Sequence, residues 1–317
     1  MILTLHTETT IDSCHNLEGY DELIKKHQVN HLKSYWYIKN RIDKEVKERS
    51  EYSTLILDSG AFSAFTQNVT IDIDQYCKDC LKLNYTYYMV LDVIGNAEET
   101  LQNQKYMEKK GIKPIPCFHY GDNWKYLDYY CEKYDYVALG GMVPITSSKL
   151  LRWLDMVFTK YPKQKFHGLG LTTQKLVHRY PWFSVDSSSW LSGARAGTLY
   201  DNKLGNKHYS SLTKLWEMKI KERGFTIKEM KENYRKRTEF NIYSYLEMQK
   251  EHKTTEFKIR QSQLCSFGVQ EQTDHKETIQ QTHMQWLKKH YGDITEELGK
   301  RLVAHEFDIP IEQVKLC

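Results

Sequence analysis

Four side chains capable of acid–base chemistry stand directly after short apolar segments of this sequence. Asp58, Asp92 and Asp186 are carboxylates, and His119 is the fourth. A carboxylate can act as a nucleophile or as a general acid or base, and an imidazole can transfer protons near neutral pH. A single aspartate after a strand is also a common turn former. Three aspartates and a histidine in equivalent positions favour a functional site over four separate turns.

Glycines occupy the same kind of position in two further segments. Gly140 and Gly141 form one pair, and Gly168 and Gly170 flank another segment end. Because only glycine lets a ligand approach the backbone so closely, these positions can admit a flat ring such as a purine. Backbone groups of the glycine pair would then bond the edge of a guanine, with Asp92 accepting from its donor groups. A tight turn explains the pair equally well.

The elements that must position these residues alternate along the chain. Apolar, β-rich segments are separated by segments with apolar residues at three- and four-residue spacing, a pattern typical of βα units around a buried parallel sheet. The predicted strands are 53–57, 87–91, 114–118, 136–139, 165–169 and 183–185, and 1–5 can add another. The predicted helices are 71–83, 97–110, 122–133, 147–160 and 173–180. Polar residues suited to N-cap positions precede or open them: Asn96, Asp122, Thr146 and Thr172.

This alternation predicts an α/β fold of the (β/α)8 TIM-barrel type. A doubly wound sheet is the alternative, but no G-x-G-x-x-G turn follows an early strand. In a parallel barrel the active site lies at the carboxyl ends of the strands, so the four acid–base residues are expected at one mouth. After Tyr200 longer, charged helical patterns occur at 211–223, 226–252, 275–290 and 294–305. We therefore expect a barrel domain over 1–210 and a helical, partly basic extension over 211–317.

The positive charge of the chain is concentrated between residues 201 and 260. The formal net charge is +4, and residues 201–260 carry 15 basic and 9 acidic side chains. A dense basic group can meet a phosphate backbone, although a solvated helix face explains the charges equally well. Its members are Lys228, Lys231, Arg235, Lys236 and Arg237.

Composition and cysteine usage indicate the class of protein. Hydrophobic residues make up 40% and charged residues 27%, as in an average soluble protein. The first residues lack the pattern of a secretory signal, and no segment is apolar over the length of a membrane span, so we expect a cytoplasmic protein without a membrane partner. Seven scattered cysteines are typical of free thiols in a reducing compartment. Cys77 and Cys80 form a C-x2-C pair inside a helical pattern, and without a second pair we expect no metal there.

Five segments resemble motifs of the tRNA-guanine transglycosylase superfamily, in the same order and with similar spacing. Residues 58–62 are similar to its D-S-G-G-F motif, 137–142 to its A-I-G-G-L motif, and 166–170 to its L-M-G-V-G motif. Residues 185–189 fall where the family has its nucleophilic aspartate, and 194–199 resemble its A-R-N-G-T-L motif. The resemblance covers a little under half of the chain.

The resemblance implies a role for each matching residue. Asp186 would be the nucleophile, Asp58 the general acid/base and Asp92 the reader of the guanine edge. Attack of a carboxylate on the anomeric carbon would expel guanine and leave a glycosyl–enzyme ester, and the second carboxylate would deprotonate the incoming base. This reaction retains the β configuration and needs no cofactor. Arg195 would contact the nucleic acid. Further residues would contact the base: Ser59, Gly60, His119, Gly140, Gly141 and Met142.

Departures from the family pattern indicate the substrate. The C-x-C-x2-C…H zinc motif is missing, because Cys265 is the only cysteine between Cys131 and Cys317. Residues 119–121 read H-Y-G where tRNA-acting members carry Q-G-G, and Ala61 replaces a glycine. This combination is similar to the phage-associated DpdA-type DNA-guanine transglycosylases, pentosyltransferases that exchange guanine for a 7-deazaguanine such as preQ0 and so protect phage DNA from restriction. The expected partners are DNA and a free 7-deazaguanine, in the host cytoplasm if a phage encodes the protein.

A guanine in duplex DNA must be flipped out before a carboxylate can reach its sugar, at a cost of a few kcal/mol. Three aromatic residues are candidates to stack on bases of the opened strand: Trp190, Tyr200 and Trp216. Trp216 stands in a helical pattern, so a position in a helix core explains it as well.

Three other functions stay open at this point. The first is a zinc-free tRNA-guanine transglycosylase. The second is a barrel hydrolase in which Asp58, Asp92, His119 and Asp186 bind a divalent metal. The third is a nucleic-acid-binding protein on a barrel that has lost its activity.

Overall fold

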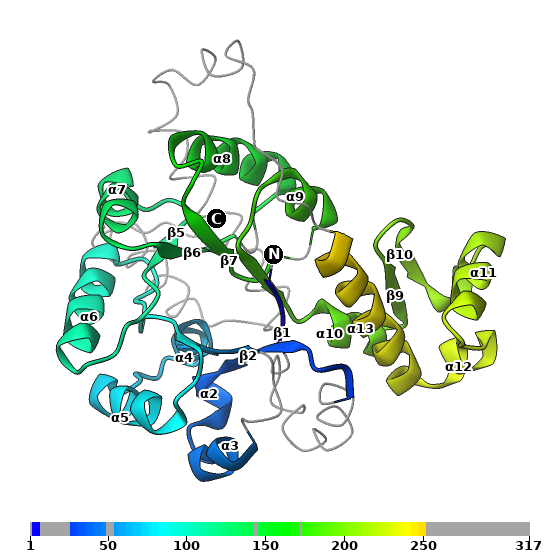
Figure 1. Ribbon diagram of the computed structural model, residues 1–317, viewed down its shortest axis with the longest axis horizontal. Coiled ribbons are helices and arrows are strands. Elements are labelled where there is room, and N and C mark those ends of the chain that lie inside the picture. Colours follow the sequence, from blue (N-terminus) through cyan, green and yellow to red (C-terminus); the bar gives the residue numbers. More distant parts are fainter. Residues whose placement is uncertain (1, 7–25, 49–53, 143–144, 172, 252–317) are drawn as a thin grey trace, which may run out of the picture.

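Eight strands of the described residues form one closed parallel sheet. The computed structural model describes residues 2–6, 26–48, 54–142, 145–171 and 173–251. Eight parallel strands pair in the order β4-β3-β2-β1-β8-β7-β6-β5. A parallel bridge between Met89 and Ile115 joins the two outer strands, so the sheet closes on itself. Helices surround the sheet, and the predicted (β/α)8 barrel is confirmed (Figure 1).

Seven of the eight strands overlap predicted segments. The strands are β1 Ile2–His6, β2 Asn30–Ser34, β3 Leu55–Asp58, β4 Tyr87–Tyr88, β5 Cys117–His119, β6 Tyr136–Gly140, β7 Lys165–Gly168 and β8 Ser184–Ser187. The strand that the sequence did not predict is β2. It lies between β1 and β3, where it completes the barrel.

Five of the helices around the barrel begin and end close to the predicted positions, and the three helices before residue 67 were not predicted. They are α2 Tyr35–Ile38, α3 Ile42–Glu48, α4 Ala61–Thr66, α5 Ile73–Leu83, α6 Ala97–Lys109, α7 Trp124–Lys133, α8 Ser147–Lys160 and α9 Gln174–Arg179. Asn96 caps α6, since its side chain accepts from the backbone N–H of Glu99. The N-cap of α7 is Asn123 rather than the predicted Asp122, whose carboxylate instead contacts the end of β5. Thr146 does precede α8, and Thr172 lies outside the described residues.

Strand β2 escaped prediction because charged side chains are buried in it. Every residue of β2 is buried, and Lys33 Nζ lies 2.5 Å from Glu45 Oε2 on α3. Arg41 and the Tyr85 hydroxyl, whose oxygen lies 3.1 Å from Glu45 Oε2, also contact this carboxylate. A buried charge is tolerated only with such partners. The ion pair therefore lets a polar sequence form a central strand.

Replacing Lys33 with methionine is expected to lower the free energy of unfolding by about 3 kcal/mol, because Glu45 then keeps its charge in the interior with one cation fewer. Urea unfolding measures this loss. The double variant Lys33→Met/Glu45→Leu removes both charges and is expected to be more stable than the single variant. A loss below about 1 kcal/mol in Lys33→Met, the range of an exposed ion pair, would contradict this account.

A hairpin that the sequence did not predict lies between β8 and the predicted start of the extension. This part of the chain contains α10 Ser189–Arg195, β9 Thr198–Asp201 and β10 Gly205–His208. A 3-10 turn, Tyr209–Ser211, leads to the helices of the extension, α11 Lys214–Glu222, α12 Ile227–Glu232 and α13 Tyr234–Glu251. The predicted continuous helix 226–252 is wrong, because it breaks at Asn233. The side chain of Asn233 accepts from the N–H groups of Arg235 and Lys236 and so starts a second helix. The predicted helices 275–290 and 294–305 lie outside the described residues.

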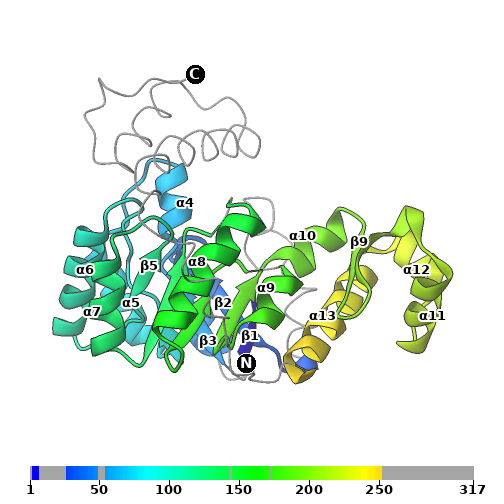
Figure 2. The ribbon, with the colours of Figure 1, turned by 90° about the horizontal axis from the view of Figure 1, so that it is seen from above.

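The extension is anchored to the barrel by α13. Ile242, Tyr245 and Met248 belong to the same core cluster as Val185 of β8. The hairpin, α11 and α12 project from one side of the barrel (Figures 1 and 2). A core cluster separate from those of the barrel holds these elements together, built on residues such as Trp216 and Phe240. Within the described residues, no helix combines the length and apolarity that crossing a bilayer requires.

Candidate active site

The predicted acid–base residues all lie at the carboxyl ends of barrel strands. Asp58 is the last residue of β3 and His119 the last of β5. Asp92 follows β4, and Asp186 is the third residue of the four in β8. Since all eight strands are parallel, these ends open at the same end of the barrel. The described residues therefore provide one mouth with three carboxylates and an imidazole.

The turn after β3 is built by the matching residues of the first motif. The N–H of Gly60 donates to Asp58 Oδ2 at 3.0 Å. Gly60 has a φ of 76°, and a Cβ at this position would lie 2.7 Å from the backbone nitrogen of Trp36. Ser59 Oγ donates to Asp92 Oδ1 at 2.7 Å. This turn thus requires glycine and ties the end of β3 to the end of β4.

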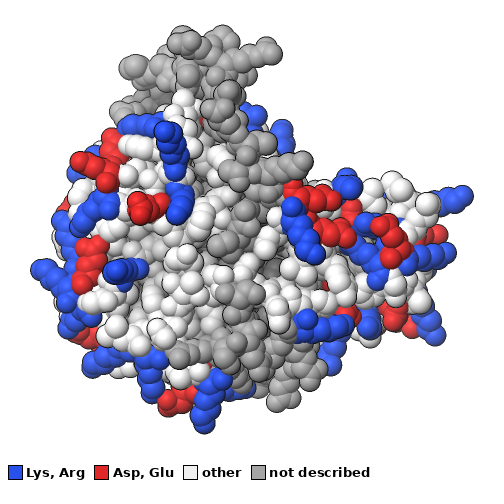
Figure 3. Space-filling model, viewed as in Figure 1, with Lys and Arg blue, Asp and Glu red and all other residues white. Residues whose placement is uncertain are grey.

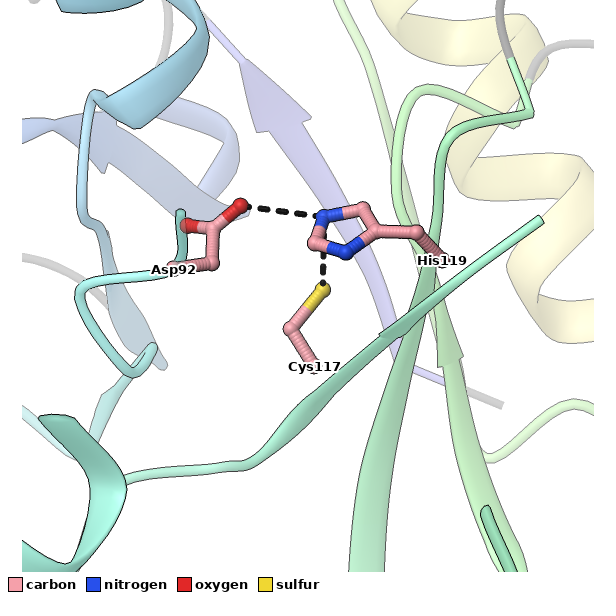
Figure 4. A group of neighbouring side chains, drawn as sticks. All are labelled: Asp92, Cys117 and His119. Carbon is pink, nitrogen blue, oxygen red and sulfur yellow. Dashed lines mark hydrogen bonds and ion pairs between the residues drawn. The ribbon is translucent and has the colours of Figure 1, made fainter. Parts of the chain in front are cut away.

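Asp92 and His119 form a hydrogen-bonded pair across the β4–β5 boundary (Figure 4). Asp92 Oδ2 lies 3.0 Å from His119 Nε2, and each side chain is 12% exposed. Burial by itself raises the pKa of Asp92, but the hydrogen bond and charge of His119 and the Ser59 hydroxyl hold it below its ordinary value. We therefore take Asp92 as ionised near neutral pH.

Two further neighbours act on the imidazole of His119. Asp122 Oδ2 accepts from the backbone N–H of His119 at 2.9 Å and lies 3.6 Å from His119 Nδ1. Burial by itself lowers the pKa of His119, while Cys117, Asp122 and Asp92 raise it well above its ordinary value. Burial also raises the pKa of the Cys117 thiol, so we assign most of the effect on His119 to the two carboxylates.

The glycine pair at the end of β6 has a different neighbour from the purine that we expected. A Cβ on Gly140 would lie 2.8 Å from His119 Cδ2, so the absence of a side chain makes room for the imidazole. Gly141 has a φ of 65° and is exposed, whereas Met142 is buried. The backbone of Gly141 is thus the part of this pair that reaches the surface of the mouth.

Asp186 is held by two donors in the barrel interior. It is 2% exposed, and its Oδ1 accepts from the Gly170 N–H at 2.9 Å and contacts His167 Nε2 at 3.2 Å. On the other side of the ring, His167 Nδ1 lies 2.6 Å from Ser184 Oγ, which also contacts the hydroxyl of Tyr136. We assign the ring proton to Nε2 from this network. The chain of hydrogen bonds then runs from Tyr136 to Asp186 and fixes the carboxylate.

Sequence reasoning missed two residues of this mouth, His167 and Cys117. Both face the barrel interior beside predicted residues, and strand periodicity could have found them. Ser184 and Asp186 are two apart in β8 and share a face, as do Cys117 and His119 in β5. The prediction was based on the residue that follows each apolar segment. Cys117 and His167 lie inside these segments and were therefore missed.

One group of potential metal ligands occurs among the described residues. Ligand atoms of Asp92, Cys117 and His119 lie within 4.8 Å of one another. Asp58 and Asp186, which the hydrolase alternative also assigns to the metal, do not belong to this group.

The predicted nucleic-acid contacts divide into exposed and buried residues. Arg195 is exposed at the end of α10, and Lys228, Lys231 and Arg235 are exposed on α12 and α13. On the face seen in Figure 3, basic and acidic side chains are interspersed over the extension. Lys236 is partly exposed and pairs with Glu239 at 3.1 Å.

Arg237 is a correction to this prediction. Its side chain is buried, Nε donates to the carbonyl of Ala194 at 2.7 Å, and Nη1 donates to the carbonyl of Met230 at 2.8 Å. The guanidinium therefore ties α13 to α10 and α12 and is not available to phosphate. The aromatic rings of Trp190 and Trp216 are also buried, which removes them as stacking platforms.

Comparison with known proteins gives likeness in structure only. No family model and no curated protein matches the sequence. A structure described as a fructose-1,6-biphosphate aldolase from Coccidioides immitis is similar with a TM-score of 0.47 and 12% identity, over 81% of this chain and 92% of that one. The carboxyl transferase domain of Rhizobium etli pyruvate carboxylase is similar with a TM-score of 0.41 and 13% identity, over 98% of this chain and 61% of that one.

At these TM-scores and identities, the likeness carries no conclusion about activity or substrate. The present chain spans less than two thirds of the carboxyl transferase chain that it matches. The barrel assignment follows from the strand order and closure of this protein. Membership of the guanine transglycosylase superfamily stays a prediction from the motifs.

Proposed function

We propose that the protein is a base-exchange pentosyltransferase that replaces guanine in DNA with a 7-deazaguanine. The observation that carries the proposal is the environment of Asp186. This carboxylate is buried at the mouth, and one of its oxygens is oriented by the Gly170 N–H and by His167. A fixed, buried carboxylate suits nucleophilic attack on an anomeric carbon, because its geometry is set before the substrate arrives.

The reaction divides into two displacements at one sugar carbon. Asp186 attacks the anomeric carbon, the bond to guanine breaks, and a glycosyl ester forms, while guanine leaves as its anion and takes a proton from water. Asp58 then takes the proton from the incoming base, whose nitrogen attacks the same carbon and releases Asp186. Because both steps invert, the β configuration is retained overall. Asp92 and His119, which are linked to the Asp58 turn through Ser59, contact the edge of the base.

DNA rather than tRNA is the proposed acceptor because the sequence lacks the zinc motif of tRNA-acting members. Exposed Arg195, Lys228, Lys231 and Arg235 supply charges for the phosphate backbone. The deciding experiment incubates the protein with DNA or with tRNA and candidate 7-deazaguanines, followed by mass analysis of the nucleosides. Modified nucleosides are expected in DNA. Incorporation into tRNA alone would transfer the protein to the tRNA-modifying alternative, and none in either would end the proposal.

His167 is expected to act as a positioning residue for Asp186. Replacing it with phenylalanine keeps a buried ring but removes a hydrogen bond to a carboxylate, which is worth about 1.5–3 kcal/mol. The single-turnover rate of exchange is therefore expected to fall about 10- to 100-fold. The KM for DNA should change little, since His167 is fully buried beneath the carboxylate.

A matched control for this prediction is His178→Phe. His178 is exposed on α9, and its Nε2 lies 2.9 Å from Oδ1 of Asn202, the residue after β9. Its replacement is expected to leave the exchange rate unchanged. An unchanged rate in His167→Phe, with thermal unfolding showing an intact fold, would contradict the positioning role.

A further inference from the structure

We propose that Asp92, Cys117 and His119 form a binding site for a divalent transition-metal ion of the zinc class. His119 Nε2 lies 3.0 Å from Asp92 Oδ2 and 3.5 Å from Cys117 Sγ. Around a tetrahedral zinc ion with ordinary bond lengths, nitrogen–oxygen and nitrogen–sulfur ligand pairs lie about 3.3 Å and about 3.6 Å apart. Two of the three ligand pairs are thus already close to the spacing of such a site, and the third pair, Asp92 and Cys117, lies within 4.8 Å (Figure 4).

The donor set suits this class of ion. A thiolate, an imidazole and a carboxylate are all common zinc ligands, and the soft thiolate disfavours magnesium and calcium. A metal-bound His119 is neutral and offers the lone pair of Nε2, and this atom faces both the sulfur and the carboxylate. A cation between the three atoms lets each of them donate a lone pair at once.

The residues behind the three ligands are those that zinc sites use to orient their ligands. A zinc-bound histidine commonly donates its other ring N–H to a carboxylate, and His119 Nδ1 faces Asp122 at 3.6 Å. A ligating carboxylate is commonly hydrogen-bonded as well, and the outer oxygen of Asp92 accepts from Ser59. Cys117 is 2% exposed, which protects its sulfur from bulk solvent.

The location gives the ion a structural and a binding role. Between β4 and β5 the barrel is closed through the Met89–Ile115 bridge, whereas the other strand pairs have two to four registered positions each. An ion held by Asp92 on one side and by Cys117 and His119 on the other would link this boundary at its mouth. Three protein ligands leave a fourth position open, which an oxygen or nitrogen atom of water or of a base can fill.

The test measures metal binding directly and does not depend on base exchange. The full chain is purified without chelator, and its zinc content is determined by elemental analysis. Cobalt chloride is then added to metal-free protein, and the absorption spectrum is recorded. We expect one ion per chain that depends on Cys117, a sulfur-to-cobalt charge-transfer band, and a higher unfolding temperature with zinc than with chelator.

Variants distinguish this site from other cysteines of the chain. Cys117→Ser is expected to abolish the charge-transfer band, and Asp122→Asn is expected to weaken zinc binding about 10- to 100-fold while keeping the band. Cys131→Ser, which replaces a half-buried thiol on α7, should change neither. A charge-transfer band that persists in Cys117→Ser, or protein that binds neither zinc nor cobalt, would overturn the proposal. Should Cys117→Ser fail to fold, Asp92→Asn gives a second reading, since loss of this ligand must also weaken binding.

Discussion

Replacing Asp186 with asparagine is expected to abolish base exchange, with a loss of roughly 10⁴-fold or more, as when a catalytic nucleophile is removed. The amide oxygen can still accept from the Gly170 N–H, so the local structure is preserved. It is not a competent nucleophile, and the glycosyl ester cannot form. The measurement is twofold: exchange of labelled guanine in DNA, and denaturing electrophoresis for a covalent protein–DNA adduct.

The control for this variant is Asp128→Asn. Asp128 lies on α7, is half exposed and pairs with Lys160, so its loss should leave both readings at the level of the unmodified protein. An undiminished adduct in Asp186→Asn would show that another side chain attacks the sugar. Retained DNA binding in this variant, measured at fixed salt concentration, would establish that chemistry rather than affinity has been lost.

Replacing Asp58 with asparagine is expected to slow exchange about 10²- to 10⁴-fold, the usual contribution of a general acid/base. Asparagine is preferred to alanine because its side-chain oxygen can keep the hydrogen bond from the Gly60 N–H. The nucleophile stays in place, so the ester still forms but the incoming base keeps its proton. We therefore expect the covalent adduct to accumulate, in contrast to Asp186→Asn.

The covalent adduct distinguishes the roles of the two aspartates, because it should be lost in Asp186→Asn and should accumulate in Asp58→Asn. Asp58→Glu is the companion variant, since it restores a carboxylate and should recover part of the rate. If Asp58→Asn exchanged base at the rate of the unmodified protein, Asp58 would be a turn residue and a different base would be needed. If neither variant formed an adduct although both bound DNA, Asp58 would be required for the first displacement as well.

Apolar segments predicted most of the barrel strands, because a parallel strand covered on both faces consists of apolar residues that are consecutive in the sequence. Buried parallel strands are covered on both faces, so Leu55, Ile56 and Leu57 read as a continuous apolar segment. β2 is also buried on both faces but contains His31 and Lys33. The burial of Lys33 depends on its ion pair with Glu45 of α3, and the sequence of β2 alone does not predict this partner.

In the extension, too, local sequence patterns gave predictions that contacts between distant segments changed. Residues 226–252 read as one helix because charged residues are good helix formers, yet Asn233 ends one helix and caps the next. Arg237 was grouped with its exposed neighbours by charge alone. Its burial is decided by the carbonyls of Ala194 and Met230, which come from two other helices.

The sequence by itself determined that Asp58, Asp92, His119 and Asp186 lie at or near the carboxyl ends of parallel strands. These positions follow from periodicity within each segment and from the rule that parallel strands end on one side. Only the tertiary structure decided which side chains meet, because strand order and register, rather than local pattern, set contacts between distant segments. In the folded protein, Asp186 contacts His167 of the neighbouring strand, and Cys117 lies beside the pair of Asp92 and His119. The imidazole of His119 fills the space next to Gly140.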